Sequence, residues 1–133
     1  MKNDLSPNGN IQLSLPLNAA YVSAARLTAS SIANRFAFNI DEIEDIKAAV
    51  SEACTFLIKK LGNTGGDFTI VFDPSRDLMR ITVKAAGTLV CGRVDEEMGL
   101  VMIRALMDSF DLSFGIDGVL IVMLKKHRKI CFD

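Results

Sequence analysis

The chain has 133 residues, of which 50% are hydrophobic and 23% are charged, and its formal net charge at pH 7 is -1. A chain of this length and composition folds around one core and leaves little scope for disorder. A surface that follows nucleic-acid phosphates needs an excess of Lys and Arg, so the charge balance excludes general nucleic-acid binding. Cys54, Cys91 and Cys131 are widely spaced and form no CxxC pair, which predicts reduced thiols.

The start of the chain has no apolar segment that would direct export, and no apolar run is long enough to cross a bilayer. We therefore expect a cytoplasmic protein that makes no membrane contact. Residues 1–9 are polar and include Pro7 and Gly9. We interpret them as a flexible N-terminal arm that precedes a single domain at residues 10–133.

The next segments predict a strand and an amphipathic helix. Residues 11–15 alternate apolar and polar side chains, as in a half-buried strand, and Pro16 ends it. Asn18 is a candidate N-cap for a helix whose apolar residues recur at i, i+3, i+4 and i+7 as far as Phe36. This helix has one apolar stripe, so we expect one of its faces to pack on the core.

A second, longer helix is predicted from Asp41 to Leu61. Asp41 and Glu44 resemble a capping box at its start, and Gly62 is a candidate C-cap. Its apolar residues form a continuous stripe, which predicts that this helix is the main partner of the sheet.

Two hairpins and a third helix complete the pattern. Strand-like runs at 68–72 and 78–83 flank one turn, and a second pair is predicted at 111–115 and 119–124. Between the hairpins, Asp95 opens a helix that is apolar nearly all round, which predicts that it is well buried. Its methionines are interpreted as core residues: Met98, Met102 and Met107.

The element order is strand, helix, helix, strand, strand, helix, strand, strand, which lacks the alternation of a parallel sheet. We therefore predict an α+β fold in two layers, with a mostly antiparallel sheet and three helices on one of its faces.

Several stretches follow the pattern of one family, densely within residues 11–62 and weakly after that: residues 15–22, 26–28, 41–47, 49–55, 99–100 and 105–108. On these residues the chain resembles the RsbW/SpoIIAB anti-sigma factor serine kinases. The resemblance implies the histidine-kinase-like ATPase fold. It also implies a protein that binds a sigma factor and uses Mg-ATP to phosphorylate a serine of an antagonist protein.

The first motif of the resembled family is a Glu that acts as base, followed four residues later by an Asn that helps to hold magnesium. Here Glu52 is present, but the later position is Phe56. A phenyl ring cannot ligate magnesium, whose shell needs oxygen atoms. Phe56 either fills the space that a nucleotide would use or packs under a neighbouring loop, and in both cases we expect no metal site.

The second and third motifs bind adenine and phosphates in the resembled family. The adenine-binding Asp corresponds to Ala85, which has no acceptor, and only the glycine of that motif is kept, as Gly87. Eleven residues separate Gly87 from Gly99, too few for the family's long lid. The carboxylates of residues 95–97 would repel a polyphosphate, although acidic residues also cap ordinary helices. We interpret Gly87, which a plain turn would also explain, and Gly99 as remnants of the nucleotide site.

Arg26 matches the first-helix arginine that contacts the sigma factor and the antagonist in the resembled family; an ordinary solvated arginine is the alternative. His127 lies in a basic tail, residues 125–129, without a neighbouring nucleophile, and we do not consider it catalytic.

The sequence therefore predicts a degenerate ATPase, a pseudo-kinase that regulates transcription by protein binding in a partner switch and needs no cofactor. The expected partners are a sigma factor, an anti-sigma factor antagonist, or both, with a second copy of the chain as a further candidate. The alternative is an active serine-protein kinase that uses Mg-ATP to phosphorylate the antagonist. A structural or assembly subunit without a sigma partner is a third interpretation.

Overall fold

One five-stranded antiparallel sheet, with strand order β1-β2-β3-β5-β4, organises the chain. The computed structural model describes residues 9–61, 66–87, 97–115 and 118–128. The strands are β1 (Ile11–Pro16), β2 (Asp67–Pro74), β3 (Leu78–Ala85), β4 (Ser109–Gly115) and β5 (Gly118–Lys126). A 3-10 turn (Ala19–Tyr21) leads into α1 (Val22–Asn34), and the other helices are α2 (Ile40–Leu61) and α3 (Met98–Leu106).

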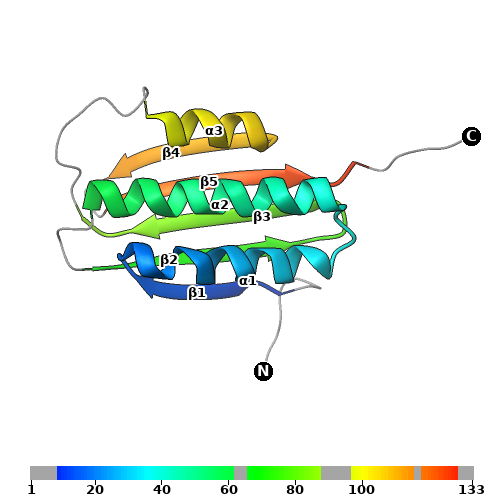
Figure 1. Ribbon diagram of the computed structural model, residues 1–133, viewed down its shortest axis with the longest axis horizontal. Coiled ribbons are helices and arrows are strands. Elements are labelled where there is room, and N and C mark those ends of the chain that lie inside the picture. Colours follow the sequence, from blue (N-terminus) through cyan, green and yellow to red (C-terminus); the bar gives the residue numbers. More distant parts are fainter. Residues whose placement is uncertain (1–8, 62–65, 88–96, 116–117, 129–133) are drawn as a thin grey trace, which may run out of the picture.

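The three α-helices lie on one face of the sheet, with α1 over β1 and β2, α2 over the centre, and α3 over β4 (Figure 1). Alternate residues of the central strands are buried against the helices, as Phe68, Ile70 and Phe72 are in β2. The predicted α+β architecture of two layers is therefore confirmed, and so is the predicted order of the elements.

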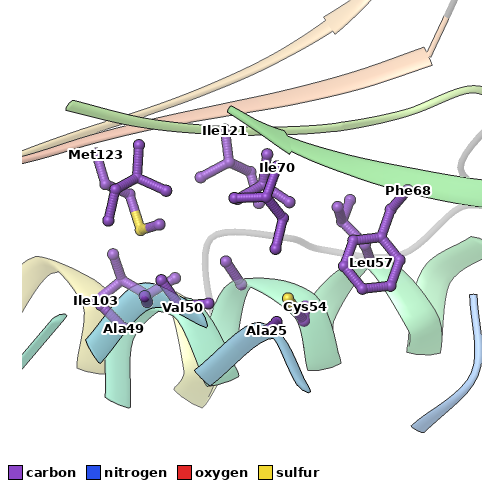
Figure 2. Packing of buried hydrophobic residues seen from close by; sticks show 14 of the residues in the cluster. Ala25, Ala49, Val50, Cys54, Leu57, Phe68, Ile70, Ile103, Ile121 and Met123 are labelled. Carbon is purple, nitrogen blue, oxygen red and sulfur yellow. The ribbon is translucent and has the colours of Figure 1, made fainter. Parts of the chain in front are cut away.

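The core lies between α2 and the three central strands (Figure 2). The buried side of α2 combines large side chains with the small Ala49, Ala53 and Cys54, which let the neighbouring helices pack closely against it. Burial raises the pKa of the Cys54 thiol to about 12, so this cysteine is an inert core residue.

The start of α2 differs from the prediction by two residues, because the capping box consists of Asn39 and Glu42 instead of Asp41 and Glu44. The Glu42 backbone N–H donates to Asn39 Oδ1 at 2.8 Å, and the Asn39 N–H donates to Glu42 Oε1 at 2.9 Å. Asn39 is a better cap than the predicted Asp41 here because buried Phe38 precedes it, as in a hydrophobic staple.

The segment predicted as a basic tail is fixed to α2 and α3. Lys125 and Lys126 belong to β5, and Lys125 Nζ donates to Asp45 Oδ2 at 3.0 Å and to the Leu106 carbonyl at 2.7 Å. Just beyond the strand, His127 Nδ1 lies 2.8 Å from Glu42 Oε1. The side chains of Lys125 and His127 therefore bind two carboxylates of α2, Asp45 and Glu42.

Glu42 is the most enclosed carboxylate of this cluster, with 6% of its surface exposed. Its Oε2 accepts a hydrogen bond from the Arg128 N–H at 2.7 Å, in addition to the bonds from Asn39 and His127. Burial alone would raise the pKa of Glu42, but the three hydrogen bonds outweigh it and hold that pKa below its ordinary value.

The prediction that the third helix is well buried is wrong. Only Leu100 and Ile103 of α3 are buried, whereas Met98 and Met102, which we expected in the core, are exposed; Met107, just after the helix, is buried as expected. The reason is that α3 lies over β4 at the edge of the sheet, where only one side of a helix meets other elements (Figure 1). The expected cap Gly62 and the expected helix start Asp95 lie outside the described residues.

No described helix combines the length and the apolar character that a membrane crossing requires.

Replacing Glu42 with Ala should lower the free energy of unfolding by about 2–4 kcal/mol, because three donors lose their buried acceptor. Urea unfolding monitored by circular dichroism measures this change. The control is Glu44→Ala, which removes an exposed ion pair with Lys47 on the same helix and should lower the free energy of unfolding by less than about 0.5 kcal/mol.

Because folding lowers the pKa of Glu42, the contribution of this carboxylate to the free energy of unfolding is complete above its ordinary pKa. The difference between wild type and Glu42→Ala should therefore shrink as the pH falls through the folded-state pKa; a constant difference would contradict the role assigned to this carboxylate.

Candidate functional site

The packing of α2 on the sheet fixes the directions of Glu52 and Phe56, the two positions that the sequence singled out. The opposite side of the helix is buried on the sheet, so Glu52 and Phe56 lie on the side that meets the start of α3. Glu52 is partly exposed, whereas only 3% of the Phe56 surface is exposed. Phe56 lies off the main apolar stripe, as expected, but it nevertheless belongs to the core.

Gly99 is in close contact with Glu52 across the α2–α3 interface. A Cβ atom at position 99 would lie 2.9 Å from Glu52 Oε1, closer than real Cβ contacts allow. The glycine therefore lets α3 approach the Glu52 side chain. Close packing of two helices is thus a sufficient reason for glycine at this position.

A cavity of about 40 Å³ lies within this group. Its lining comes from both helices: Glu52, Thr55, Phe56, Lys59, Glu97 and Gly99. This volume suits about one water molecule, while a small-molecule site usually offers several hundred Å³. This cavity is therefore too small for a nucleotide.

Glu97 holds the start of α3 to the end of α2. Its Oε1 lies 2.6 Å from Lys60 Nζ, and its Oε2 lies 3.5 Å from Lys59 Nζ. The hydrogen bond from Lys60 is the main cause that lowers the pKa of Glu97. The sequence did not predict the Lys60–Glu97 pair, because no local pattern indicates that two charged residues 37 positions apart will meet. The other acidic residues of the predicted cluster, Asp95 and Glu96, lie outside the described residues.

Ala85 and Gly87 lie apart from this group. Ala85 is the last residue of β3, is buried and pairs with Phe68 and Val119, and it does not line the small cavity. Gly87 has a φ of 131°, a backbone conformation that side chains disfavour, so the turn itself accounts for glycine here. The structure thus brings together Glu52, Phe56 and Gly99 but neither of these two residues.

A larger hollow of about 580 Å³ lies on the face of the sheet that the helices leave uncovered. Thr69, Lys84 and Leu120, from three different strands, are among the residues that line it. It is open to solvent, and the polar side chains that line it among the described residues are Asp67, Thr69, Lys84 and Ser113.

Arg26 is exposed on α1, as predicted, and its side chain has no hydrogen bond or ion pair with other described residues. Leu27 on the same helix and Tyr21 just before the helix are also exposed. In contrast, His127 is bound to Glu42 and stacks edge-on with Phe38 at a centroid distance of 5.8 Å. A structural role for His127 agrees with these contacts.

Comparison with known proteins identifies the family. Residues 15–125 match the family model of the histidine kinase-like ATPase domain. The chain is similar to the serine-protein kinase RsbW of Halalkalibacterium halodurans, with 32% identity over 86% of this chain and 82% of that protein. It is also 32% identical to the Bacillus cereus RsbW, over 86% of this chain and 83% of the relative.

The chain belongs to the histidine kinase-like ATPase family. Within this family, the chain is related to serine-protein kinases named RsbW, which confirms the resemblance that the sequence indicated. The solved structure of the RsbU and RsbW domains of Rv1364c from Mycobacterium tuberculosis has the same fold, with a TM-score of 0.75 and 17% identity. That match covers 93% of this chain and 34% of the larger one.

Truncating Phe56 measures how completely this histidine kinase-like ATPase domain fills the space beside Glu52. Phe56→Ala should lower the free energy of unfolding by about 3–5 kcal/mol, because a buried ring leaves a cavity between α2 and α3. Denaturant unfolding gives this value. Thr55→Ala, an exposed neighbour on the same helix, is the control and should change stability by less than about 0.5 kcal/mol. A loss below about 1 kcal/mol for Phe56→Ala would mean that the ring packs loosely.

Proposed function

We propose that this protein is a non-catalytic regulator that acts by binding a sigma factor or an anti-sigma factor antagonist in a partner switch. The observation that carries this proposal is the buried Phe56 ring beside Glu52, which lines a cavity of about 40 Å³ between α2 and the start of α3. The protein keeps the scaffold of a kinase family but fills the place where the nucleotide chemistry would take place.

The chemistry of the residues supports the loss of catalysis. Phosphoryl transfer depends on positioning and on neutralising the phosphate charge with metal ions. The resemblance places a magnesium ligand where Phe56 stands and an adenine acceptor where Ala85 stands, and neither side chain offers an oxygen or nitrogen atom. Glu52 alone, without a bound metal and nucleotide, has no reaction to promote.

Electrostatics at the start of α3 supports the same conclusion. Among the described residues, Lys59 and Lys60 lie at the start of α3, the helix N-terminus that would hold phosphates, and both already pair with Glu97. An incoming polyphosphate would have to displace this carboxylate from the lysines and would be repelled by it.

The surface of α1 supports binding to a protein partner. Arg26 is exposed and without a partner among the described side chains, and the apolar side chains of Leu27 on α1 and of Tyr21 just before it are exposed too. Exposed arginine and tyrosine side chains are enriched in protein interfaces. We assign the sigma factor or antagonist to this surface.

The alternative function is that of an active serine-protein kinase that uses Mg-ATP to phosphorylate the antagonist. It is favoured by the partly exposed Glu52 at the position of the family's base and by the relatives, which are named serine-protein kinases. It would require α3 to move away from α2, so that Glu97 releases its lysines and the Phe56 ring is uncovered.

Mg-ATP should not raise the melting temperature of the protein, because a ligand stabilises a fold only by binding it. Differential scanning fluorimetry at millimolar Mg-ATP measures this, with the Halalkalibacterium halodurans serine-protein kinase RsbW as the positive control. A reproducible, saturable increase in melting temperature would contradict the proposed loss of nucleotide binding and would favour the kinase.

Arg26→Ala should weaken binding of the sigma factor or antagonist at least about tenfold, as expected for an arginine at the centre of an interface. Co-purification with candidates encoded near the gene, followed by isothermal titration calorimetry, measures the affinity. Arg35→Ala changes another exposed arginine just after the same helix and should leave the affinity unchanged. Equal affinities for wild type and Arg26→Ala would place the interface elsewhere.

A further inference from the structure

The hollow on the uncovered face of the sheet lies where neighbouring strands carry little or no side chain. Gly118 of β5 pairs with Gly115 of β4 and lies next to Ala86, and all three residues line the hollow. Gly118 has a φ of 144°, and a Cβ atom there would collide with the Ala85 carbonyl oxygen, so the backbone itself requires glycine. The hollow is therefore built into the strand pairing, and its volume of about 580 Å³ is in the range of small-molecule sites.

Two side chains of opposite charge line this hollow. Lys84 of β3 pairs in register with Thr69 of β2, and Asp67 precedes Thr69 by two positions, so both charged side chains are on the uncovered face. Both are exposed, and neither has an ion pair or a side-chain hydrogen bond with another described residue. The Cα atoms of such diagonal neighbours are about 7–8 Å apart, which leaves room for a small ligand between the two charged groups.

The other lining side chains add hydroxyl groups and an apolar wall. Thr69 and Leu120 flank Lys84 on the two neighbouring strands, and Ser113 follows beside Leu120 on β4. The Thr69 hydroxyl is 3.0 Å from that of Ser14, so its position is fixed by a hydrogen bond, whereas Leu120 is an exposed apolar residue. A carboxylate beside Lys84 would thus meet a cation and hydroxyl donors, and an apolar group next to it would cover Leu120.

We propose that this hollow binds a small zwitterion with an apolar side chain, which is the chemistry of an apolar amino acid such as leucine. Its carboxylate binds the Lys84 ammonium and the Thr69 hydroxyl, its ammonium binds the Asp67 carboxylate, and its aliphatic side chain lies on Leu120.

Charge complementarity selects the zwitterion over simpler ions. A ligand with only a negative charge would be repelled by Asp67, and a ligand with only a positive charge would be repelled by Lys84. A polyphosphate would meet the first of these penalties several times over. A ligand that carries both charges satisfies both side chains at once.

The position of the two charges in the sheet argues against a purely protective role. Charged side chains often keep the edge strands of a sheet from pairing with another chain. Lys84, however, is on β3, the central strand, and Asp67 is on β2, between β1 and β3. Neither residue therefore protects an edge.

This inference does not depend on the proposed function. The hollow is on the face of the sheet opposite to the helices, whereas Arg26, Glu52 and Phe56 belong to α1 and α2 (Figure 1). Occupation of the hollow and binding of a partner to α1 can accordingly be abolished separately.

Isothermal titration calorimetry of the full chain with leucine and two analogues tests the proposal. Isocaproate keeps the carboxylate and the side chain of leucine but lacks the amine, and isopentylamine lacks the carboxylate. Leucine should bind saturably at millimolar concentration, and each analogue should bind at least about tenfold more weakly, because each loses one charge-assisted contact. Absence of leucine binding at millimolar concentration, or equal affinities for leucine and both analogues, would overturn the proposal.

Two variants locate the site and assign the two contacts. Lys84→Met and Asp67→Asn should each weaken leucine binding at least about tenfold. Lys84→Met should also abolish the preference for leucine over isopentylamine, whereas Asp67→Asn should abolish the preference over isocaproate. Leucine affinity that survives both substitutions would place the binding elsewhere and overturn the proposal.

The matched control is Arg80→Met, which removes another exposed cation from the uncovered face of β3, outside the hollow, and should leave leucine binding unchanged. Equal losses in Arg80→Met and Lys84→Met would contradict a specific site, since they would indicate a general effect of charge. Circular dichroism checks that each variant is folded, as expected for substitutions at exposed positions. Lys84→Met should retain the affinity for the α1 partner, and Arg26→Ala should retain leucine binding.

Discussion

The fit of α2 against the sheet is the constraint on which the other features of this protein depend. Its inner face is lined with small residues such as Ala49, Ala53 and Cys54, which have no exposed surface, so the helix cannot rotate without opening voids in the core. Because the rotation of α2 is fixed, the directions of Glu42, Glu52 and Phe56 are fixed with it. One end of the helix therefore binds the end of β5, and the other end meets α3.

The two ends of α2 use electrostatics in different ways. At the start, Glu42 is enclosed and accepts hydrogen bonds from Asn39, His127 and Arg128, so removing it would leave buried donors unsatisfied. At the end, Lys59 and Lys60 hold Glu97 at a more exposed position, where ion pairs contribute little to stability. The second pair matters mainly for position, since it keeps the start of α3 over Phe56 and Glu52.

Much of the fold could be predicted from the sequence, because the period of the apolar residues depends only on local geometry. The apolar stripe of α2 correctly predicted most of the residues that this helix buries, and the strand-like runs at 68–72 and 78–83 correspond to β2 and β3. Capping was less certain, because Asn39–Glu42 and Asp41–Glu44 fit the same pattern, and the choice depended on contacts with Phe38 and with the end of β5. The burial of α3 was predicted wrongly because an apolar sequence does not reveal that a helix lies at the edge of a sheet.

The sequence by itself determined the family, the two-layer α+β architecture and the chemical identities at the candidate site, above all a phenyl ring four residues after Glu52. These follow from residue types and spacing, which are local properties of the chain. Only the tertiary structure decided that Phe56 is buried, that Gly99 approaches Glu52, that Glu97 binds two lysines, and that one face of α3 stays uncovered. These depend on which distant segments meet and how closely they pack, which is a property of the assembled core and not of any single segment.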